Sequence, residues 1–396
     1  MPTLALPDKP SIAVLPFANM SGDPEQECFA DGMVEEIITA LSRIRWLFVI
    51  ARNSSFTYKG RTVDVKRIGR ELGVRYVLEG SVRKAAGRVR ITAQLIDALS
   101  GTHLWADRFD GSLDDIFELQ DKVAFSVAGV IEPTLMASEI RRSVERPTSE
   151  LTAYDLYLRS LNEFPHSLPL LEEAIARDPY FGPALSHAAM CCVNLINLGS
   201  GEHQAAVRRK GLDFARRALK VIGEDPRALI TAAFALAAFG EDIATMMALV
   251  DRGLALNPSS ARGWYLSGCL KLWSGEPDLA IDHVGRAQRL NPRAQSGTSS
   301  WYSYVVGAAL FLSRRFEEAA AELMLAIHGQ PSFPTPYRYL AACYAHMGLL
   351  NEAREVVARL RTITPVPIPD FPLPLRLPEH RELYLSGLRL AAGEVE

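Results

Sequence analysis

The first third of the chain alternates short apolar runs with amphipathic stretches, which is typical of an α/β domain. Residues 11–17 (SIAVLPF) and 47–51 (LFVIA) are apolar runs of strand length. Between them, apolar residues recur every three or four positions over 30–44, which predicts a helix with one face on a sheet. Asp23 is a suitable N-cap for this helix, with Pro24 at its first position.

A second helix, three strands and a closing helix complete the predicted domain. Asp64 caps a short helix that Gly73 ends. Residues 88–97 alternate apolar and polar positions, which predicts a strand with one face toward water. Turn signals at 86–87 and 100–101 place a strand on each side of it. The predicted order is β-α-β-α-β-β-β-α, with a mixed sheet.

The rest of the chain repeats a helix–turn–helix pattern at a regular interval. The spacing from Pro258 to Pro292 equals the spacing from Pro331 to Pro365. Three small residues lie at one fixed distance before the last three of these prolines: Gly268, Gly307 and Ala341. A period of about 34 residues, with small side chains where two helices cross, is typical of TPR repeats. We expect five or six stacked helix pairs over 151–364.

These patterns predict an α/β domain followed by an all-α TPR superhelix. We expect an N-terminal tail at 1–9, the α/β domain at 10–137 and a linker at 138–150. Helical repeats follow at 151–365, and a proline-rich segment with a C-terminal capping helix at 366–396.

Composition narrows the function classes. The chain of 396 residues is 48% hydrophobic with a net charge of −3, so it is neither disordered nor globally attractive to nucleic acid. The first residues lack the basic and apolar regions of a signal peptide. The longest apolar stretch, 228–239, is shorter than the roughly 20 residues of a membrane span. We expect a cytoplasmic protein without a membrane span.

The sequence contains no motif for catalysis or metal binding. It lacks G-x-x-x-x-G-K-[ST], G-x-G-x-x-G, H-E-x-x-H and G-x-S-x-G. The eight histidines lack the spacing of metal ligands, and no two of the five cysteines form a C-x-x-C unit. We therefore expect no enzyme activity, no cofactor and no metal.

Four blocks of the first domain resemble a known family. They are residues 10–37 (PSIAVLPFANMSGDPEQECFADGMVEEI), 48–60 (FVIARNSSFTYKG), 71–84 (ELGVRYVLEGSVRK) and 89–110 (VRITAQLIDALSGTHLWADRFD). In this order they resemble the TolB-like amino-terminal domain. In that family the domain accompanies TPR repeats and is attached to bacterial class III adenylate or guanylate cyclases, or to CadC-like winged-helix regulators. The sequence of these blocks is most similar to the cyclase-associated form of the domain.

The resemblance implies a role in bacterial signalling. In the cyclase proteins a catalytic domain would precede the segment LALPDKPSIAVLPF, and in the regulators a winged helix would precede it. This chain begins at that segment. The resemblance therefore implies a region related to cyclases but not itself catalytic, and without direct binding to nucleic acid.

Two candidate surfaces lie on the α/β domain. A helix N-terminus after the first strand can hold an anion through free backbone N–H groups. With the residues after the second strand it predicts a ligand pocket made of Asn19, Ser21, Asp23, Arg52, Asn53, Ser54 and Ser55. Ordinary turn and capping chemistry is the alternative interpretation. The second surface is a basic hairpin with Arg83, Lys84, Arg88 and Arg90. It can bind phosphate or an acidic partner, and a solvated strand face is the alternative interpretation.

The third candidate surface is the concave face of the repeats. Matching to the TPR pattern predicts partner-binding residues on the first helix of successive pairs: Arg262, Tyr265, Trp301, Tyr304 and Arg338. Aromatic and arginine side chains suit a groove that holds an extended segment or a helix. Alternatively, some of the aromatics belong to the core between repeats.

The leading hypothesis is a non-catalytic interaction or sensor module. It binds a protein partner through the TPR groove, with the α/β domain as a docking or ligand-sensing head for a small-molecule effector. One alternative is the detached regulatory half of an adenylate or guanylate cyclase that acts with a separate catalytic domain. Another is the regulatory part of a transcriptional regulator.

Overall fold

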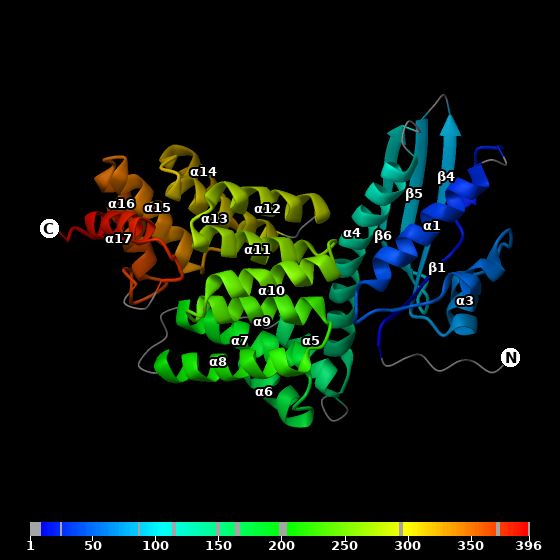
Figure 1. Cartoon of the computed structure of the whole chain (residues 1–396), viewed down its shortest axis with the longest axis horizontal. Coiled ribbons are helices and arrows are strands. Elements are labelled where there is room, and N and C mark those ends of the chain that lie inside the picture. Colours follow the sequence, from blue (N-terminus) through cyan, green and yellow to red (C-terminus); the bar gives the residue numbers. More distant parts are fainter. Residues whose placement is uncertain are drawn as a thin grey trace. The chain divides into compact units, whose positions relative to one another are not determined.

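The computed structural model describes residues 9–23, 26–85, 88–112, 116–147, 151–162, 167–197, 204–292, 296–369 and 373–394. The chain divides into two units, Met1–Arg142 and Ser143–Glu396 (Figure 1). The first contains a mixed sheet with helices, and among the described residues of the second the regular elements are all helices. The predicted fold class, an α/β domain followed by all-α repeats, is confirmed.

The sheet of the first unit combines parallel and antiparallel pairing. Its strands are β1 Ser11–Val14, β2 Ala18–Asn19, β3 Phe48–Val49, β4 Tyr76–Ala85, β5 Arg88–Asp97 and β6 His103–Ser112. The order is β3-β1-β4-β5-β6, with β2 also beside β4. β1 pairs in parallel with β3 and β4, and β4, β5 and β6 form an antiparallel meander. The helices are α1 Gln26–Ser42, α2 Arg52–Ser55, η1 Phe56–Tyr58, α3 Val65–Leu72 and α4 Ile116–Glu145.

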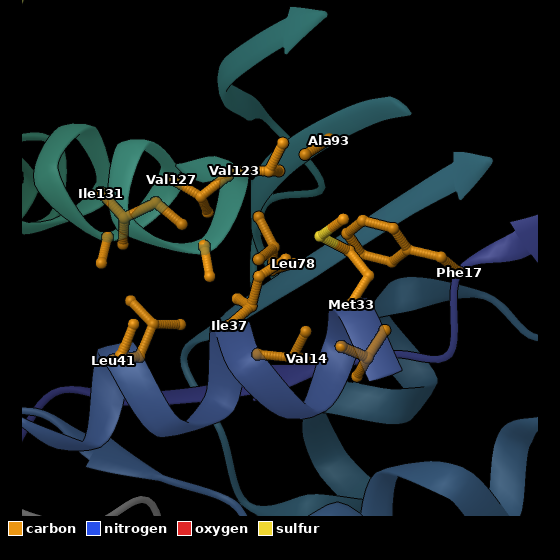
Figure 2. Packing of buried hydrophobic residues seen from close by; sticks show 14 of the residues in the cluster. Val14, Phe17, Met33, Ile37, Leu41, Leu78, Ala93, Val123, Val127 and Ile131 are labelled. Atoms are coloured by element: carbon orange, nitrogen blue, oxygen red, sulfur yellow. The ribbon is translucent and has the colours of Figure 1, made fainter. Parts of the chain in front are cut away.

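Helices α1 and α4 cover one face of this sheet (Figure 2). On α1, Met33, Ile37 and Leu41 recur once per helical turn and are fully buried. Val127 and Ile131 of α4 belong to the same buried cluster and lie opposite these α1 side chains. Burying each such side chain contributes roughly 1.5–3 kcal/mol, so this layer supplies most of the unit's core. The smaller α3 covers only part of the opposite face.

Helix α4 is longer than the sequence indicated, and it includes residues that we expected in a linker. Residues 138–145 are helical and continue α4, and the two units divide within the expected linker 138–150, between Arg142 and Ser143. Glu139 is buried, and its Oε2 lies 2.8 Å from Nη1 of Arg75. The hydroxyl of Tyr76 donates to its Oε1 at 2.6 Å. Arg75, which precedes β4, and Tyr76, its first residue, therefore satisfy a buried carboxylate near the end of α4.

The same helix bears on membrane association. In the described part of the chain, Phe117–Glu145 is long and apolar enough to cross a membrane by length and composition alone. Its apolar side lies in the core of the α/β unit, where Val123 and Val127 pack against α1. A core helix passes the same test, so this helix is weak evidence for a membrane span.

The second unit is an array of helix pairs. Its helices are α5 Ala153–Asn162, α6 Leu168–Arg177, α7 Gly182–Asn197, α8 Gln204–Val221, α9 Pro226–Ala238, α10 Ile243–Leu256, α11 Ala261–Ser274, α12 Pro277–Leu290, α13 Ser296–Leu312, α14 Phe316–Gly329, α15 Pro334–His346, α16 Leu350–Arg361 and α17 Pro378–Ala392. From α5 to α16 they pack as six consecutive pairs (Figure 1). The first helices of neighbouring pairs also pack against each other, and α17 packs on α15 and α16.

Glycines lie where paired helices approach each other most closely. A Cβ added at Gly268 of α11 would lie 3.1 Å from the carbonyl oxygen of Ala280 and 3.0 Å from Cγ2 of Val284, both on α12. At Gly307 of α13 it would lie 3.2 Å from the carbonyl oxygen of Ala319. The small residues that define the sequence period are therefore those that let the helices touch.

We expect Gly268→Leu to lower the free energy of unfolding by about 2 kcal/mol, because the added side chain overpacks the α11–α12 contact. Gly285→Ala is the matched control in the same helix pair, since only Arg289 lies within 4 Å of its added Cβ. It should raise stability by up to about 1 kcal/mol through helix propensity. Urea unfolding followed by circular dichroism measures the stability of both variants. Equal changes in stability would contradict a close helix contact at Gly268.

Candidate functional site

The loop between β2 and α1 closes on itself. The side-chain amide of Asn19 donates to the carbonyl oxygen of Asp23 at 2.8 Å, and the backbone N–H of Ser21 donates to Oδ1 of Asn19. The N–H of Lys84 donates to Oγ of Ser21 at 2.8 Å. These bonds support the turn-chemistry interpretation. Pro24, the expected first helical residue, lies outside the described residues.

The residues after β3 form a helical turn. Arg52, Asn53, Ser54 and Ser55 are the helix α2. The guanidinium of Arg52 lies 4.0 Å from the centre of the Phe56 ring, and Ser55 is buried. These contacts favour ordinary turn structure over a pocket wall. That this segment and the β2–α1 loop together line one ligand pocket stays a prediction.

A cavity of about 1070 Å³ lies in this unit, over the face of β4–β6 that α3 leaves uncovered. Of the predicted pocket residues, Asn19 alone lines it among those that the structure describes. Polar strand residues form its floor: Glu79, Ser81, Thr92 and Gln94. The side-chain amide of Gln94 donates to Glu79, and the hydroxyls of Ser81 and Thr92 are hydrogen-bonded.

Charged residues border this cavity. Lys59, Arg61 and Arg108 lie at its edge together with Glu27 and Asp107. Lys59 is bound to Asp31 at 2.7 Å, and this hydrogen bond raises the pKa of Lys59. A site with both charge signs and amide and hydroxyl groups suits a polar small molecule. The alternation of 88–97 had placed Thr92 and Gln94 on the water-facing side, but it gave no sign that neighbouring loops enclose that face.

The basic hairpin is partly paired with carboxylates. Nε of Arg90 lies 2.7 Å from Oδ1 of Asp110, and Nζ of Lys84 lies 3.7 Å from Oδ2 of Asp23. The hydrogen bond from Arg90 lowers the pKa of Asp110. This cross-strand pairing favours a solvated strand face over a phosphate grip.

The aromatic residues expected in the concave groove pack between helix pairs. The rings of Tyr265 and Tyr302 are 5.7 Å apart. Those of Trp301 and Tyr304 lie 4.4 and 5.5 Å from the ring of Phe333, which precedes α15. Trp301, Tyr304 and Tyr265 are half-buried. Much of their surface therefore serves the contact between neighbouring pairs.

Arg338 is bound to the chain's own C-terminal residues. Its side chain is 1% exposed, because the chain's own residues cover it. Its Nη2 donates to the carbonyl oxygen of Val366 at 2.7 Å and its Nε to that of Pro367 at 3.2 Å. Nη1 lies 3.4 Å from the carbonyl oxygen of Asn197, at the end of α7. The sequence predicted an extended segment after α16 but not where it would dock.

Arg262 differs from Arg338, since its side chain on α11 is exposed to water although protein surrounds it on several sides. Desolvation by these surrounding helices lowers its pKa, and the charge of Arg227 lowers it further. The hydroxyls of Tyr157, Tyr265 and Tyr302 raise it. Within the described residues Arg262 has no carboxylate partner. An exposed guanidinium beside a second arginine and three tyrosine hydroxyls can bind the carboxylate of an acidic side chain.

His187 on α7 lies close to both arginines. Burial, together with the charges of Arg262 and Arg227, lowers the pKa of His187 to about 3. Its ring lies 6.1 Å from that of Tyr157. His187 is therefore neutral at physiological pH and adds no charge to the arginine pair.

This depressed pKa makes the helical unit sensitive to acid. The unfolded chain takes up a proton at His187 near pH 6.5 and the folded chain only near pH 3, so stability is lost as the pH falls between these values. At about 1.36 kcal/mol per pKa unit, lowering the pH from 6.5 to 5 should cost the unmodified chain about 2 kcal/mol more than His187→Gln. Urea unfolding at both pH values measures this, and equal losses would refute it.

Two comparisons of sequence relate the chain to signalling proteins. Residues 8–125 match the family described as HilA/YgeH-like transcriptional regulator, second domain. The chain is 46% identical over 246 residues to the protein named "Putative adenylate cyclase 3" of Rhizobium meliloti (strain 1021). That match covers 59% of this chain and 41% of the relative, so the chain spans about two fifths of the relative's length.

Solved structures of low identity resemble parts of the chain. The Cut9–Hcn1 hetero-tetramer of the APC/C matches 69% of this chain and 49% of its own, with 14% identity and a TM-score of 0.44. A MamA RS-1 variant matches 46% and 93%, with 16% identity and a TM-score of 0.33. TolB from Acinetobacter baumannii matches 33% and 29%, with 18% identity and a TM-score of 0.24. At these scores the likenesses identify no function.

The two sequence matches confirm the resemblance that the four amino-terminal blocks predicted. The matched domain is that of a regulator, and the relative is named as an adenylate cyclase. Together with the array of helix pairs, they support a signalling or regulatory role based on protein interaction.

Proposed function

We propose that this chain is the regulatory and protein-binding part of a bacterial signalling protein, with no catalysis of its own. Its helical array binds a partner, and its α/β unit is the docking or ligand-sensing head in the cytoplasm. The observation that carries the proposal is Arg338, which holds two successive backbone carbonyls of an extended segment at 2.7 and 3.2 Å. An array that binds one extended segment has the chemistry to bind another.

Arg262, the exposed arginine on α11, indicates that the partner carries acidic side chains. Arg262 has no carboxylate partner among the residues that the structure describes, and Arg227 lies close enough to lower its pKa. An acidic side chain of a partner would relieve the repulsion between the two cations. The cavity over β4–β6 is the matching candidate for a small polar effector, with Gln94 and Glu79 as its hydrogen-bonding groups.

A specific observation favours a second candidate function. The relative named as an adenylate cyclase is 46% identical over the matched region, and the match covers 41% of it. The chain is then the regulatory half of an adenylate or guanylate cyclase and acts with a separate catalytic domain. The regulator domain matched at 8–125 favours, in the same way, a regulatory part of a transcriptional regulator.

Partner capture tests the leading proposal. We expect Arg262→Ala to reduce recovery of a specific partner from the source bacterium about tenfold, because truncating an arginine at the centre of an interface typically removes more than about 1 kcal/mol. Arg252→Ala is the matched control, an exposed arginine on the neighbouring α10. Mass spectrometry of the captured proteins measures recovery. Equal recovery with both variants would count against the proposal.

Cyclase assays separate the two candidates. The chain alone should form no cyclic nucleotide from ATP or GTP. Added to a purified class III catalytic domain, it should change that domain's rate only if the second candidate is correct. Cyclic nucleotide formed by the chain alone would contradict both.

A further inference from the structure

The residues after α16 cross back over the helical array. We call the described residues 364–369 and 373–377 the arm. Thr364 and Leu375 in the arm are buried, with 1% and 3% of their surface exposed. The arm therefore covers part of the array and excludes water there.

The first anchor of the arm is Arg338. Its guanidinium binds the carbonyl oxygens of Val366 and Pro367, and its remaining nitrogen faces the end of α7. Prolines alternate along this stretch, at 365, 367 and 369. Proline fixes an extended backbone and has no N–H, so the free carbonyls are presented to a donor at little entropic cost.

The second anchor is Arg376, near the end of the arm itself. Its backbone N–H donates to the carbonyl oxygen of Trp273 at 2.8 Å. Its Nη2 donates to the carbonyl oxygens of Ala237 at 2.7 Å and Glu241 at 3.1 Å. The arm thus reaches from the sixth helix pair to the ends of α9 and α11, which belong to the third and fourth pairs.

The helix that follows the arm makes contacts of its own with the array. The ring of Tyr384 on α17 lies 4.5 Å from that of Tyr339 on α15. The ring nitrogen Nε2 of His346 lies 2.8 Å from the carbonyl oxygen of Leu383. These contacts hold α17 on α15 in addition to the two anchors, so α17 does not depend on the arm alone for its position.

We propose that the surface beneath the arm is the docking site for an extended, proline-containing segment of a protein partner. The arm occupies this site in the absence of the partner. The inference deepens the proposed function and rests on it, because it names the partner's chemistry at the same helical array. Arg338 recognises two successive carbonyls of an extended backbone, and prolines pre-organise such a backbone in a partner as they do in the arm. The tethered arm is a competitor at high effective concentration.

A labelled peptide with the sequence of residues 364–377 tests this by fluorescence anisotropy on the full chain. Arg376→Ala loosens the arm and leaves Arg338 in place, so it should bind the peptide at least tenfold more tightly than the unmodified chain. The double variant Arg338→Ala and Arg376→Ala should lose this gain. Arg361→Ala, an exposed arginine at the end of α16, is the matched control and should behave as the unmodified chain.

Equal peptide binding by Arg376→Ala and the unmodified chain would overturn the proposal. So would a gain that survives removal of Arg338. If light scattering shows that Arg376→Ala forms a dimer and this dimer does not bind the peptide, the released arm binds a second copy of the chain. That result would also overturn the proposal. Because the assay contains only the chain and the peptide, its failure differs from a failure to capture a partner.

Circular dichroism establishes that each variant is folded. If Arg376→Ala is not, hydrogen exchange of the unmodified chain replaces it. Excess peptide should then speed exchange at the Arg376 amide at least fivefold, and unchanged exchange would contradict the proposal.

Discussion

The buried guanidinium of Arg338 is the constraint on which the C-terminal half of the structure depends. A charge removed from water is costly unless its donors find acceptors. Arg338 meets this requirement with backbone carbonyls from segments that lie 28, 29 and 141 residues away. One side chain therefore fixes the arm, the sixth helix pair and the end of α7 relative to one another.

This arrangement gives the two arginines of the predicted groove opposite roles. Arg338 is satisfied by the chain itself, whereas Arg262 is exposed beside Arg227 without a carboxylate partner among the described residues. The aromatic residues between them pack against neighbouring helix pairs. An array of this kind holds a segment by its backbone at one place and offers charge at another, which suits recognition of an extended chain with acidic side chains.

Local patterns predicted the elements because each pattern follows from contacts near in sequence. The period of small residues revealed the helix pairs, since Gly268 and Gly307 must be small for their helices to touch. Alternation over 88–97 revealed the antiparallel strand. The end of α4 was missed because its Glu139 is satisfied by Arg75, 64 residues away. The cavity over β4–β6 and the docking of the arm were missed for the same reason, since both depend on which distant segments come together.

The central claim is that the surface around Arg338 binds extended segments in general and its own arm in particular. A crystal structure of the Arg376→Ala chain with the peptide of residues 364–377 tests this most directly. The account requires the peptide backbone to lie on Arg338, with two successive carbonyl oxygens within hydrogen-bond distance of the guanidinium and the chain's own arm displaced. A peptide bound at another surface, or an arm still seated on Arg338 beside it, would contradict the account.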